Sequence, residues 1–183
     1  MDRAERKRNM LFVCTRTYDD VSYNSNRFRR FINRADCFKF LQSDCNMDAD
    51  DLLDFAYGAN IKIVNHPKES DRLLTISFDG GDYHEFTEVF RVNSNDADEH
   101  ILFKFDRDRF VILGRGNVSE MRELMNEDFD RERMNLAKSY PSMFENSVYD
   151  IDEYSASFHN KKDLDVLTWD IVSIGLKNLY KGE

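Results

Sequence analysis

The sequence has little proline, glycine, cysteine and tryptophan, and it has no long apolar run. Its 183 residues include 2 prolines, 7 glycines, 3 cysteines and 1 tryptophan. No apolar run approaches the roughly 18–20 residues that a membrane-spanning helix needs, so we expect no membrane-spanning protein. No proline- or serine-rich linker and no internal repeat divides the chain, and its length is typical of one domain. We therefore expect a single domain over residues 1–183.

The three cysteines exclude two kinds of cross-linked fold. Cys14, Cys37 and Cys45 are odd in number and have no CxxC spacing. A disulfide framework needs paired cysteines in a secreted chain, and two cysteines eight residues apart do not supply the four ligands of a structural zinc site. We expect free thiols, no metal and no cofactor.

The first residues do not form an export signal. Residues 1–9 are polar and basic, and the apolar stretch after them, residues 10–14, is too short for a signal peptide and runs into Arg16. We expect a frayed basic arm at residues 1–9 and a cytoplasmic protein, which means the host cytoplasm if the source is a virus.

Aromatic residues are abundant by contrast. Phe and Tyr number 15 and 8, and 41 % of the chain is hydrophobic, which is enough to bury a core and excludes wholesale disorder. The richness in Asn, Asp, Phe and Tyr is typical of AT-rich genomes, including those of large phages and other viruses.

Charge is divided unevenly along the chain. Asp and Glu number 35 against 26 Lys and Arg, for a net charge of −9. Residues 1–46 hold ten basic and six acidic side chains, whereas residues 47–183 hold sixteen and twenty-nine. This asymmetry predicts a basic region on an acidic body, which favours basic partners for the body and disfavours nonspecific DNA binding.

Hydrophobic periodicity predicts an α+β fold. Strand-like alternation recurs through residues 61–113 and predicts an antiparallel β-meander. Two helices, at about 120–138 and 163–180, are expected to cover one face of it. Residues 142–162 read as irregular. The other expected elements are a strand at 11–18 and helices at about 26–43 and 49–57.

Hairpin register can be predicted because directly opposed residues share a face of the sheet. A three-residue loop at 79–81 places Leu74 opposite Phe86 and Ile76 opposite His84. A four-residue loop at 106–109 places Phe105 opposite Phe110 and Phe103 opposite Ile112. Both arrangements give the meander one apolar face.

The expected helix at 26–43 carries the main candidate binding residues. Arg27, Arg30 and Arg34 follow helical spacing on one face, Arg29 and Lys39 flank them, and the phenylalanines lie largely on the opposite, buried face. Such a stripe fits an acidic protein patch or nucleic-acid phosphates. It also fits a solvated helix whose arginines pair with the acidic body.

Three weaker constellations remain. His84 and Glu88 are expected on the apolar face, where a carboxylate with a raised pKa serves as an acid or base. Alternatively, Glu88 lies at the sheet margin, where water or an arginine reaches it, and His84 is a hydrogen-bonded core residue. Arg115, Gly116 and Asn117 lie between a strand and a helix, where an anion can bind. Four aspartates in the two hairpin turns are weak candidates for Mg²⁺, because turns favour aspartate for backbone reasons alone. They are Asp79, Asp82, Asp106 and Asp108.

None of these constellations amounts to a known catalytic motif. We therefore expect a non-enzymatic interaction or regulatory protein, such as a phage- or virus-type modulator of a host factor, with a protein as its partner. The first alternative is a nucleic-acid-binding regulator that uses residues 26–43. The second is a small enzyme acting on a phosphorylated or nucleotide substrate.

Overall fold

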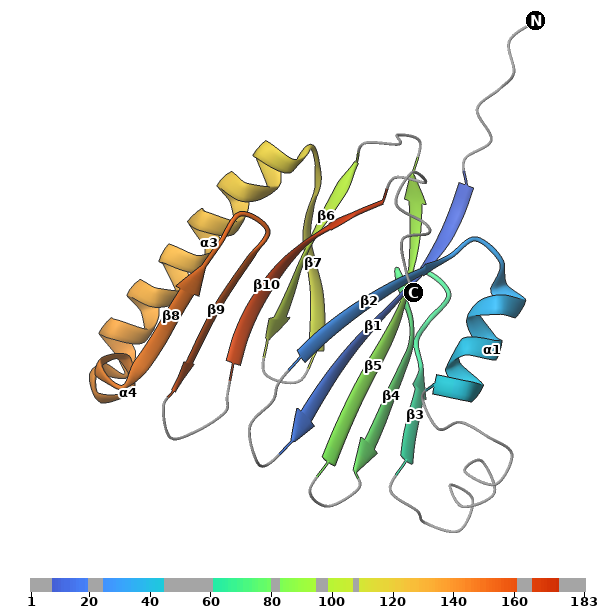
Figure 1. Ribbon diagram of the computed structural model, residues 1–183, viewed down its shortest axis with the longest axis horizontal. Helices are drawn as coiled ribbons and strands as arrows, with labels where there is room; N and C mark the ends of the chain where they lie inside the picture. The colour runs from blue at the N-terminus through green and yellow to red at the C-terminus, as the bar shows by residue number, and fades with distance from the viewer. Residues whose placement is uncertain are drawn as a thin grey trace, which may run out of the picture. The chain divides into compact units, whose positions relative to one another are not determined.

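The computed structural model describes residues 8–19, 25–44, 61–79, 83–94, 99–106, 109–160 and 166–174. The chain divides into two compact units, Met1–Asn95 and Asp96–Glu183, each of which contains a five-stranded antiparallel sheet (Figure 1). The α+β class and the antiparallel pairing predicted from the sequence are confirmed. The expected single meander is divided, because its first three strands belong to one sheet and its last two to the other.

The described residues of the first unit form strands β1 to β5 and one helix. Its sheet has the strand order β2-β1-β5-β4-β3, so β2 and β3 are the terminal strands. The strands are β1 (Arg8–Asp19), β2 (Ser25–Phe31), β3 (Ile61–Asn65), β4 (Arg72–Asp79) and β5 (Tyr83–Ser94), and the helix is α1 (Arg34–Asp44).

Helix α1 covers one face of this sheet. Cys37 and Leu41 of the helix are 2 % exposed and pack with Val13, Ile76 and Val89 of three strands. The other face carries side chains that are equally buried, among them Phe12 and Phe90, which are paired across β1 and β5. Both faces of this sheet therefore hold buried residues, whereas the sequence suggested that only one face is apolar.

The described part of the second unit forms five further strands and two helices. Its sheet has the order β7-β6-β10-β9-β8. The strands are β6 (His100–Asp106), β7 (Arg109–Gly116), β8 (Ser147–Ile151), β9 (Ser155–Asn160) and β10 (Val166–Ser173), and the helices are α3 (Val118–Ser139) and α4 (Pro141–Glu145).

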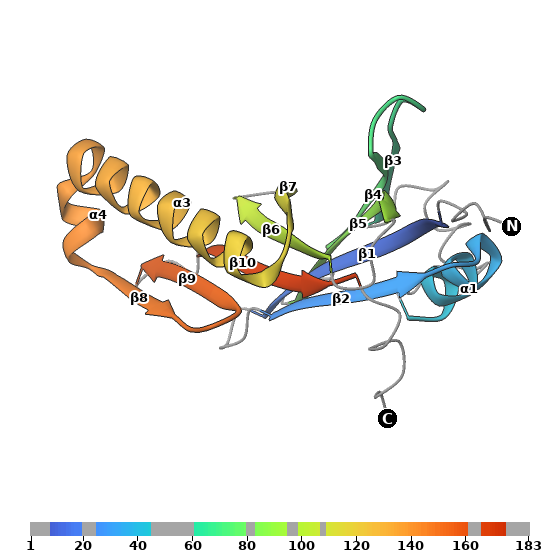
Figure 2. The same ribbon diagram turned by 90° about the horizontal axis from the view of Figure 1, so that it is seen from above.

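Helix α3 lies along one face of the second sheet (Figure 2). Met121, Met125 and Phe129 of the helix pack against Phe158 and Trp169 of the sheet. The approach is close at Gly114, where a Cβ atom would lie 2.7 Å from Leu124 Cδ2. The predicted helix at 120–138 is therefore confirmed as α3, and glycine at 114 leaves room for it.

Two expected helices were wrong in whole or in part. Residues 25–31 form β2, which pairs with β1, and the helix begins only after Asn33, whose Oδ1 accepts a hydrogen bond from the Ala35 amide. Residues 166–173 form β10, which pairs on both sides, with β6 and β9. The sequence suggested a helix here because Leu167, Ile171 and Ile174 recur at helical spacing, and this spacing is also compatible with a strand.

Other expectations had mixed outcomes. The predicted register of Phe105 opposite Phe110 and Phe103 opposite Ile112 is confirmed. The register at 79–81 was wrong, because Ile76 lies opposite Thr87 rather than His84. The irregular reading of 142–162 was also wrong, since this stretch forms most of α4 and all of β8 and β9. The expected short helix at 49–57, residues 1–7 of the expected basic arm and Cys45 lie outside the described residues. The last two residues of that arm, Arg8 and Asn9, are not frayed, because they begin β1 and pair with Ser94 and Asn93 of β5.

Candidate partner-binding surface

The expected basic helix is divided between a strand and a helix. Arg27 and Arg30 lie on β2, whereas Arg34 and Lys39 lie on α1. In the β1–β2 ladder Arg27 is opposite Thr15 and Arg30 is opposite Phe12, so the two arginines point to opposite faces of the sheet. The single helical stripe that the sequence suggested does not exist.

Arg30 differs from the other predicted residues. It shares its face of the sheet with the fully buried Phe12 and is itself half-buried. Burial lowers the pKa of its guanidinium from the usual value, because the charged form loses hydration. It is therefore less accessible to a partner than its neighbours.

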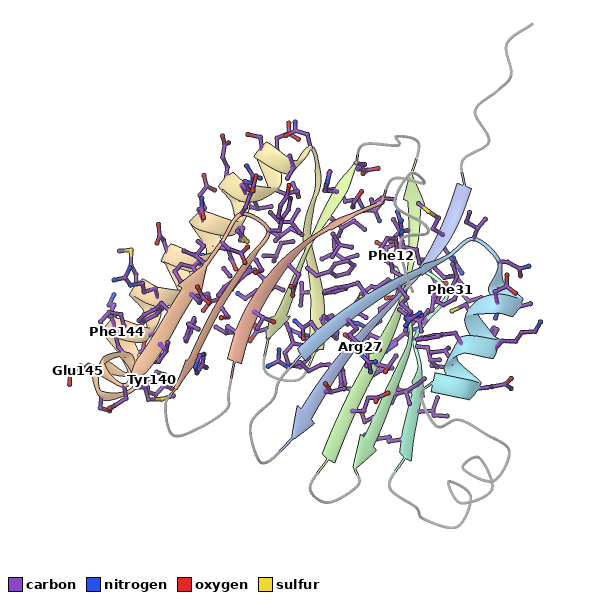
Figure 3. All side chains as sticks on the ribbon, in the orientation of Figure 1. Phe12, Arg27, Phe31, Tyr140, Phe144 and Glu145 are labelled. Carbon is purple, nitrogen blue, oxygen red and sulfur yellow. The ribbon has the colours of Figure 1, made fainter. Side chains whose placement is uncertain are left out.

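Four cations form what we call the cationic surface of the first unit, and Figure 3 labels Arg27 on β2. Arg27 and Arg29 are exposed on the face of β2 that α1 covers, and α1 adds two exposed cations of its own. The members are Arg27, Arg29, Arg34 and Lys39.

Two of these cations are held against phenylalanine rings. The Arg29 guanidinium carbon lies 4.8 Å from the ring centroid of Phe40, and that of Arg34 lies 5.3 Å from the centroid of Phe38. Phe40 in turn packs against Phe31, with ring centroids 5.3 Å apart. Stacking restricts each guanidinium while leaving its N–H edge available, which suits bidentate binding of an oxyanion.

The predicted anion-binding residues are used within the chain. Asn117 is the N-cap of α3: its side chain accepts from the Glu120 amide, and the Glu120 carboxylate accepts from the Asn117 amide. This capping box places a carboxylate at the start of the helix, next to Gly116. Because that carboxylate occupies the position where an anion would bind, the geometry disfavours Arg115, Gly116 and Asn117 as an anion site.

Glu88 is buried in a polar network rather than at an open site. It is 2 % exposed, its Oε1 accepts from Thr75 Oγ1 at 3.0 Å, and Arg72 Nε lies 2.8 Å from the same oxygen. His66 Nε2 lies 2.7 Å from Thr75 Oγ1. Since the Thr75 hydroxyl has one proton and gives it to Glu88, His66 Nε2 is the donor to Thr75.

This network ties the β3–β4 hairpin to β5. His66 follows β3, Arg72 and Thr75 belong to β4, and Glu88 belongs to β5. His84, which was predicted on the same face as Glu88, lies on β5, and its side chain is outside the described residues. The sequence therefore identified Glu88 but missed His66, which is distant in sequence and reaches Glu88 only through Thr75.

A second buried charge network was not predicted from the sequence. Lys104 and Asp128 are 5 % and 2 % exposed, and Lys104 Nζ lies 2.9 Å from Asp128 Oδ2 and 2.6 Å from Glu132 Oε1. Trp169 Nε1 donates to Asp128 Oδ2 at 2.9 Å, and Arg131 also pairs with Asp128. A lysine inside the apolar run of β6 was the available signal, because a buried lysine needs a charged partner.

The remaining metal candidates gain no support. Within the described ranges, no group of three or more histidine, cysteine or acidic side chains could hold a metal ion. Asp82 and Asp108 lie outside those ranges. No described helix is both long and apolar enough to cross a membrane.

No protein family, no curated protein and no solved structure matches this chain. The candidate site is therefore defined by its own geometry: stacked and exposed cations on β2 and α1 of an acidic chain.

Proposed function

We propose that the protein is a non-enzymatic interaction protein that binds an acidic surface of a partner protein through its cationic surface. One observation carries the proposal: Arg27, Arg29, Arg34 and Lys39 are all exposed on β2 and α1 of a chain whose net charge is −9. These four positive charges form a surface of opposite sign to the chain as a whole. Such a patch sets partner choice and steers association.

The chemistry of the surface suits carboxylates. A guanidinium presents a planar fork of N–H groups that matches a carboxylate in two parallel hydrogen bonds. Each exposed pair contributes only about 0.2–1 kcal/mol, so recognition requires several of the cations together. In keeping with the composition, we place the protein among phage- or virus-type modulators that act on a host factor in the host cytoplasm.

Single-stranded nucleic acid is the second candidate ligand. Phe38 is 45 % exposed beneath Arg34, whereas the sequence suggested that it belongs to the core. An exposed aromatic ring beside cations can stack on a base while the cations contact phosphates. This observation supports nucleic acid more strongly than the sequence did.

The two ligand classes are separated by defined probes and a matched pair of variants. The test variant is Arg27→Gln combined with Arg34→Gln. The control is Lys62→Gln combined with Lys68→Gln, because both lysines are exposed and lie at the other end of the same sheet, Lys62 on the terminal strand β3 and Lys68 in the connection from β3 to β4. Binding to a fluorescent polyglutamate peptide and to a single-stranded oligonucleotide is measured, followed by pull-down from host lysate with and without nuclease.

We expect the test variant to weaken polyglutamate binding by about three- to tenfold and the control to change it less than twofold. A protein partner retained after nuclease, and lost with the test variant alone, supports the proposal. A partner set that disappears with nuclease supports nucleic acid instead. Equal losses from test and control variants contradict a localised surface.

A further inference from the structure

Strand β8 ends the second sheet with unpaired main-chain groups. It is the last strand in the order β7-β6-β10-β9-β8, and its ladder is with β9. The Asp152 amide donates to the Ser155 carbonyl at 2.8 Å, which fixes the phase of the ladder. Since hydrogen-bonded and non-hydrogen-bonded pairs alternate, the N–H and C=O groups of Tyr149 and Ile151 point away from β9, and no described group pairs with them.

The stretch that forms this edge is acidic, although Arg133 of α3 lies over the rings of Tyr149 and Phe144, 5.1 and 5.9 Å from their centroids. Residues 139–160 contain no lysine or arginine, and Glu145, Asp150, Asp152 and Glu153 are all exposed. Arg122 pairs with Glu153, which leaves three carboxylates without a cation from this stretch. Hydrogen bonds from the Tyr154 amide and from Ser155 lower the pKa of Asp152, so its charge persists in mildly acidic solution.

The edge also has one apolar and one acidic face. Tyr149 and Ile151 share the face of Phe158 and Ala156, which belong to the core beneath α3. Asp150 lies on the opposite face. Ile151 is 48 % exposed, and Figure 3 shows Tyr140, Phe144 and Glu145 gathered where α4 leads back to β8.

We propose that the outer edge of β8 binds an extended segment of a basic partner protein as a sixth strand of this sheet, antiparallel to β8 like every other strand pair in it. Main-chain hydrogen bonds to Tyr149 and Ile151 supply the pairing, as in other cases of strand addition. The segment alternates basic residues, which face Asp150, with apolar residues, which face Ile151. A second copy of the chain is a poor occupant, because its own β8 carries the same carboxylates.

This site is separate from the cationic surface of the first unit and has the opposite charge. The two therefore select different partners, and loss of one leaves the other intact. Their failures are distinguishable because the probes differ in sign.

The geometry makes a specific statement about the added strand. Residues directly opposite Tyr149 and Ile151 exchange hydrogen bonds with them and share their apolar face. The apolar residues of the segment are therefore the ones whose amides point at β8, and the amides of the basic residues point away.

A seven-residue peptide that alternates valine and arginine tests this statement by fluorescence anisotropy. We expect N-methylation of its valine amides to weaken binding at least about tenfold, since several hydrogen bonds are lost together. N-methylation of its arginine amides changes binding about twofold or less. Equal effects of the two methylation patterns would overturn strand addition, because nonspecific attraction to an acidic protein does not distinguish them.

Protein variants give an independent readout. Ile151→Pro removes one outward N–H, and edge strands tolerate proline there, so we expect about tenfold weaker binding, while Ile151→Val stays within about twofold. Asp150→Asn weakens binding about two- to fivefold, and Asp130→Asn, on the exposed side of α3, serves as the charge-matched control. Hydrogen exchange of unmodified protein should show protection of the Tyr149 and Ile151 amides on peptide binding. Unchanged exchange with bound peptide would contradict the proposal without any variant.

Discussion

The buried carboxylate of Glu88 on β5 connects this strand to β4 and to the residue that follows β3. Thr75 and Arg72 contact Glu88 directly, and His66 reaches it through the Thr75 hydroxyl. A carboxylate that is 2 % exposed is stable only when such partners replace its hydration. The network therefore fixes the β3–β4 hairpin, and the buried oxygen is engaged rather than available for chemistry.

Replacing Glu88 should destabilise the protein while leaving partner binding intact. Glu88→Gln removes the charge that compensates Arg72, and because Arg72 retains 23 % exposure we expect a loss of about 2 kcal/mol rather than the 3–5 of a fully buried pair. Urea denaturation measures the change. Glu69→Gln, at an exposed position of the same hairpin, should shift the midpoint little; equal shifts would show that Glu88 is not specially held.

Cys37 should make the free energy of unfolding fall as the pH becomes alkaline. Burial raises the pKa of its thiol from 9.0 to about 11, because the thiolate loses hydration, and nearby Arg34 only partly opposes this. The unfolded chain therefore loses this proton at lower pH than the native chain. Stability from this group is intact below pH 9 and is lost between pH 9 and about 11.

The measurement is the free energy of unfolding of the native sequence and of Cys37→Ala across this range. We expect the native sequence to lose roughly 2 kcal/mol more than the variant between pH 8.5 and 10.5. Other groups titrate in both proteins and cancel in the comparison. Parallel profiles would show that the thiol is not protected by burial.

Sequence reasoning succeeded at single residues where local rules decide and failed where distant contacts decide. Glu88 was identified as a candidate because a charged residue stood in an alternating strand. His66 was missed because its role depends on Thr75, to which the β3–β4 hairpin brings it. The prediction that Arg27, Arg30 and Arg34 share one helical face was wrong. Consecutive residues of a strand point to opposite faces, so Arg27 and Arg30, three positions apart on β2, lie on different faces.

At the scale of elements, α1 has a buried side and an exposed side, and the sequence assigned one residue to the wrong side. Leu41 is 2 % exposed in the core of the first unit, whereas Phe38, which was expected on the buried face, is 45 % exposed beneath Arg34. The expected face was wrong because the helix begins only after Asn33, so the pattern of residues 26–43 did not belong to one helix.

The two positions form a matched pair for mutation. Leu41→Ala should cost about 2–4 kcal/mol because it opens a cavity between α1 and the sheet. Phe38→Ala should cost less than about 1 kcal/mol, although it removes the larger side chain, because its ring already contacts solvent. Thermal or urea unfolding of both variants decides; a larger loss from Phe38→Ala would mean that the ring is covered.

Helix α3 is held to its sheet by charge as well as by apolar packing. Asp128 accepts from the Trp169 indole and pairs with Lys104 beneath the helix. Asp128→Asn leaves Lys104 buried with a weaker partner, so we expect a loss of about 2–4 kcal/mol. The protein contains a single tryptophan, so its fluorescence reports this site directly. Asp130→Asn, exposed two residues away, is the control and should leave emission and midpoint unchanged.

Element prediction was reliable where periodicity had one reading. The strands β3 to β7 and helix α3 were expected near their observed bounds, because strict alternation or a clear amphipathic stripe marks each. Strand β10 was predicted as a helix because its apolar residues Leu167, Ile171 and Ile174 also fit helical spacing, whereas its pairing with β6 and β9 makes it a strand. Hairpin register was correct for β6–β7 and wrong for β4–β5, where turn length does not follow from matching apolar residues alone.

At the scale of the whole molecule, the prediction of one domain is still to be tested. The chain divides at residues 95 and 96 into two compact units, each with its own hydrophobic cluster. Natural reporters are separated in the same way, because Trp169 lies in the second unit and all three cysteines lie in the first. Both units can therefore be followed in one sample.

We expect tryptophan fluorescence and cysteine protection to be lost at the same urea concentration, as one cooperative domain requires. Leu41→Ala should then move both midpoints together, although it changes the first unit alone. Separate transitions, with only cysteine protection shifted by Leu41→Ala, would show that the chain is two domains.

The Lys104–Asp128 pair limits how these two positions can change during evolution. A chain that loses Lys104 keeps Asp128 buried with Arg131 as its cation, and a chain that loses Asp128 keeps Lys104 buried with Glu132 alone, so either intermediate is less stable than the intact pair. The two positions should therefore behave as one inherited character. Among homologous sequences, we expect either charged residues at both positions 104 and 128 or apolar residues at both. Trp169 should be retained only where both positions are charged.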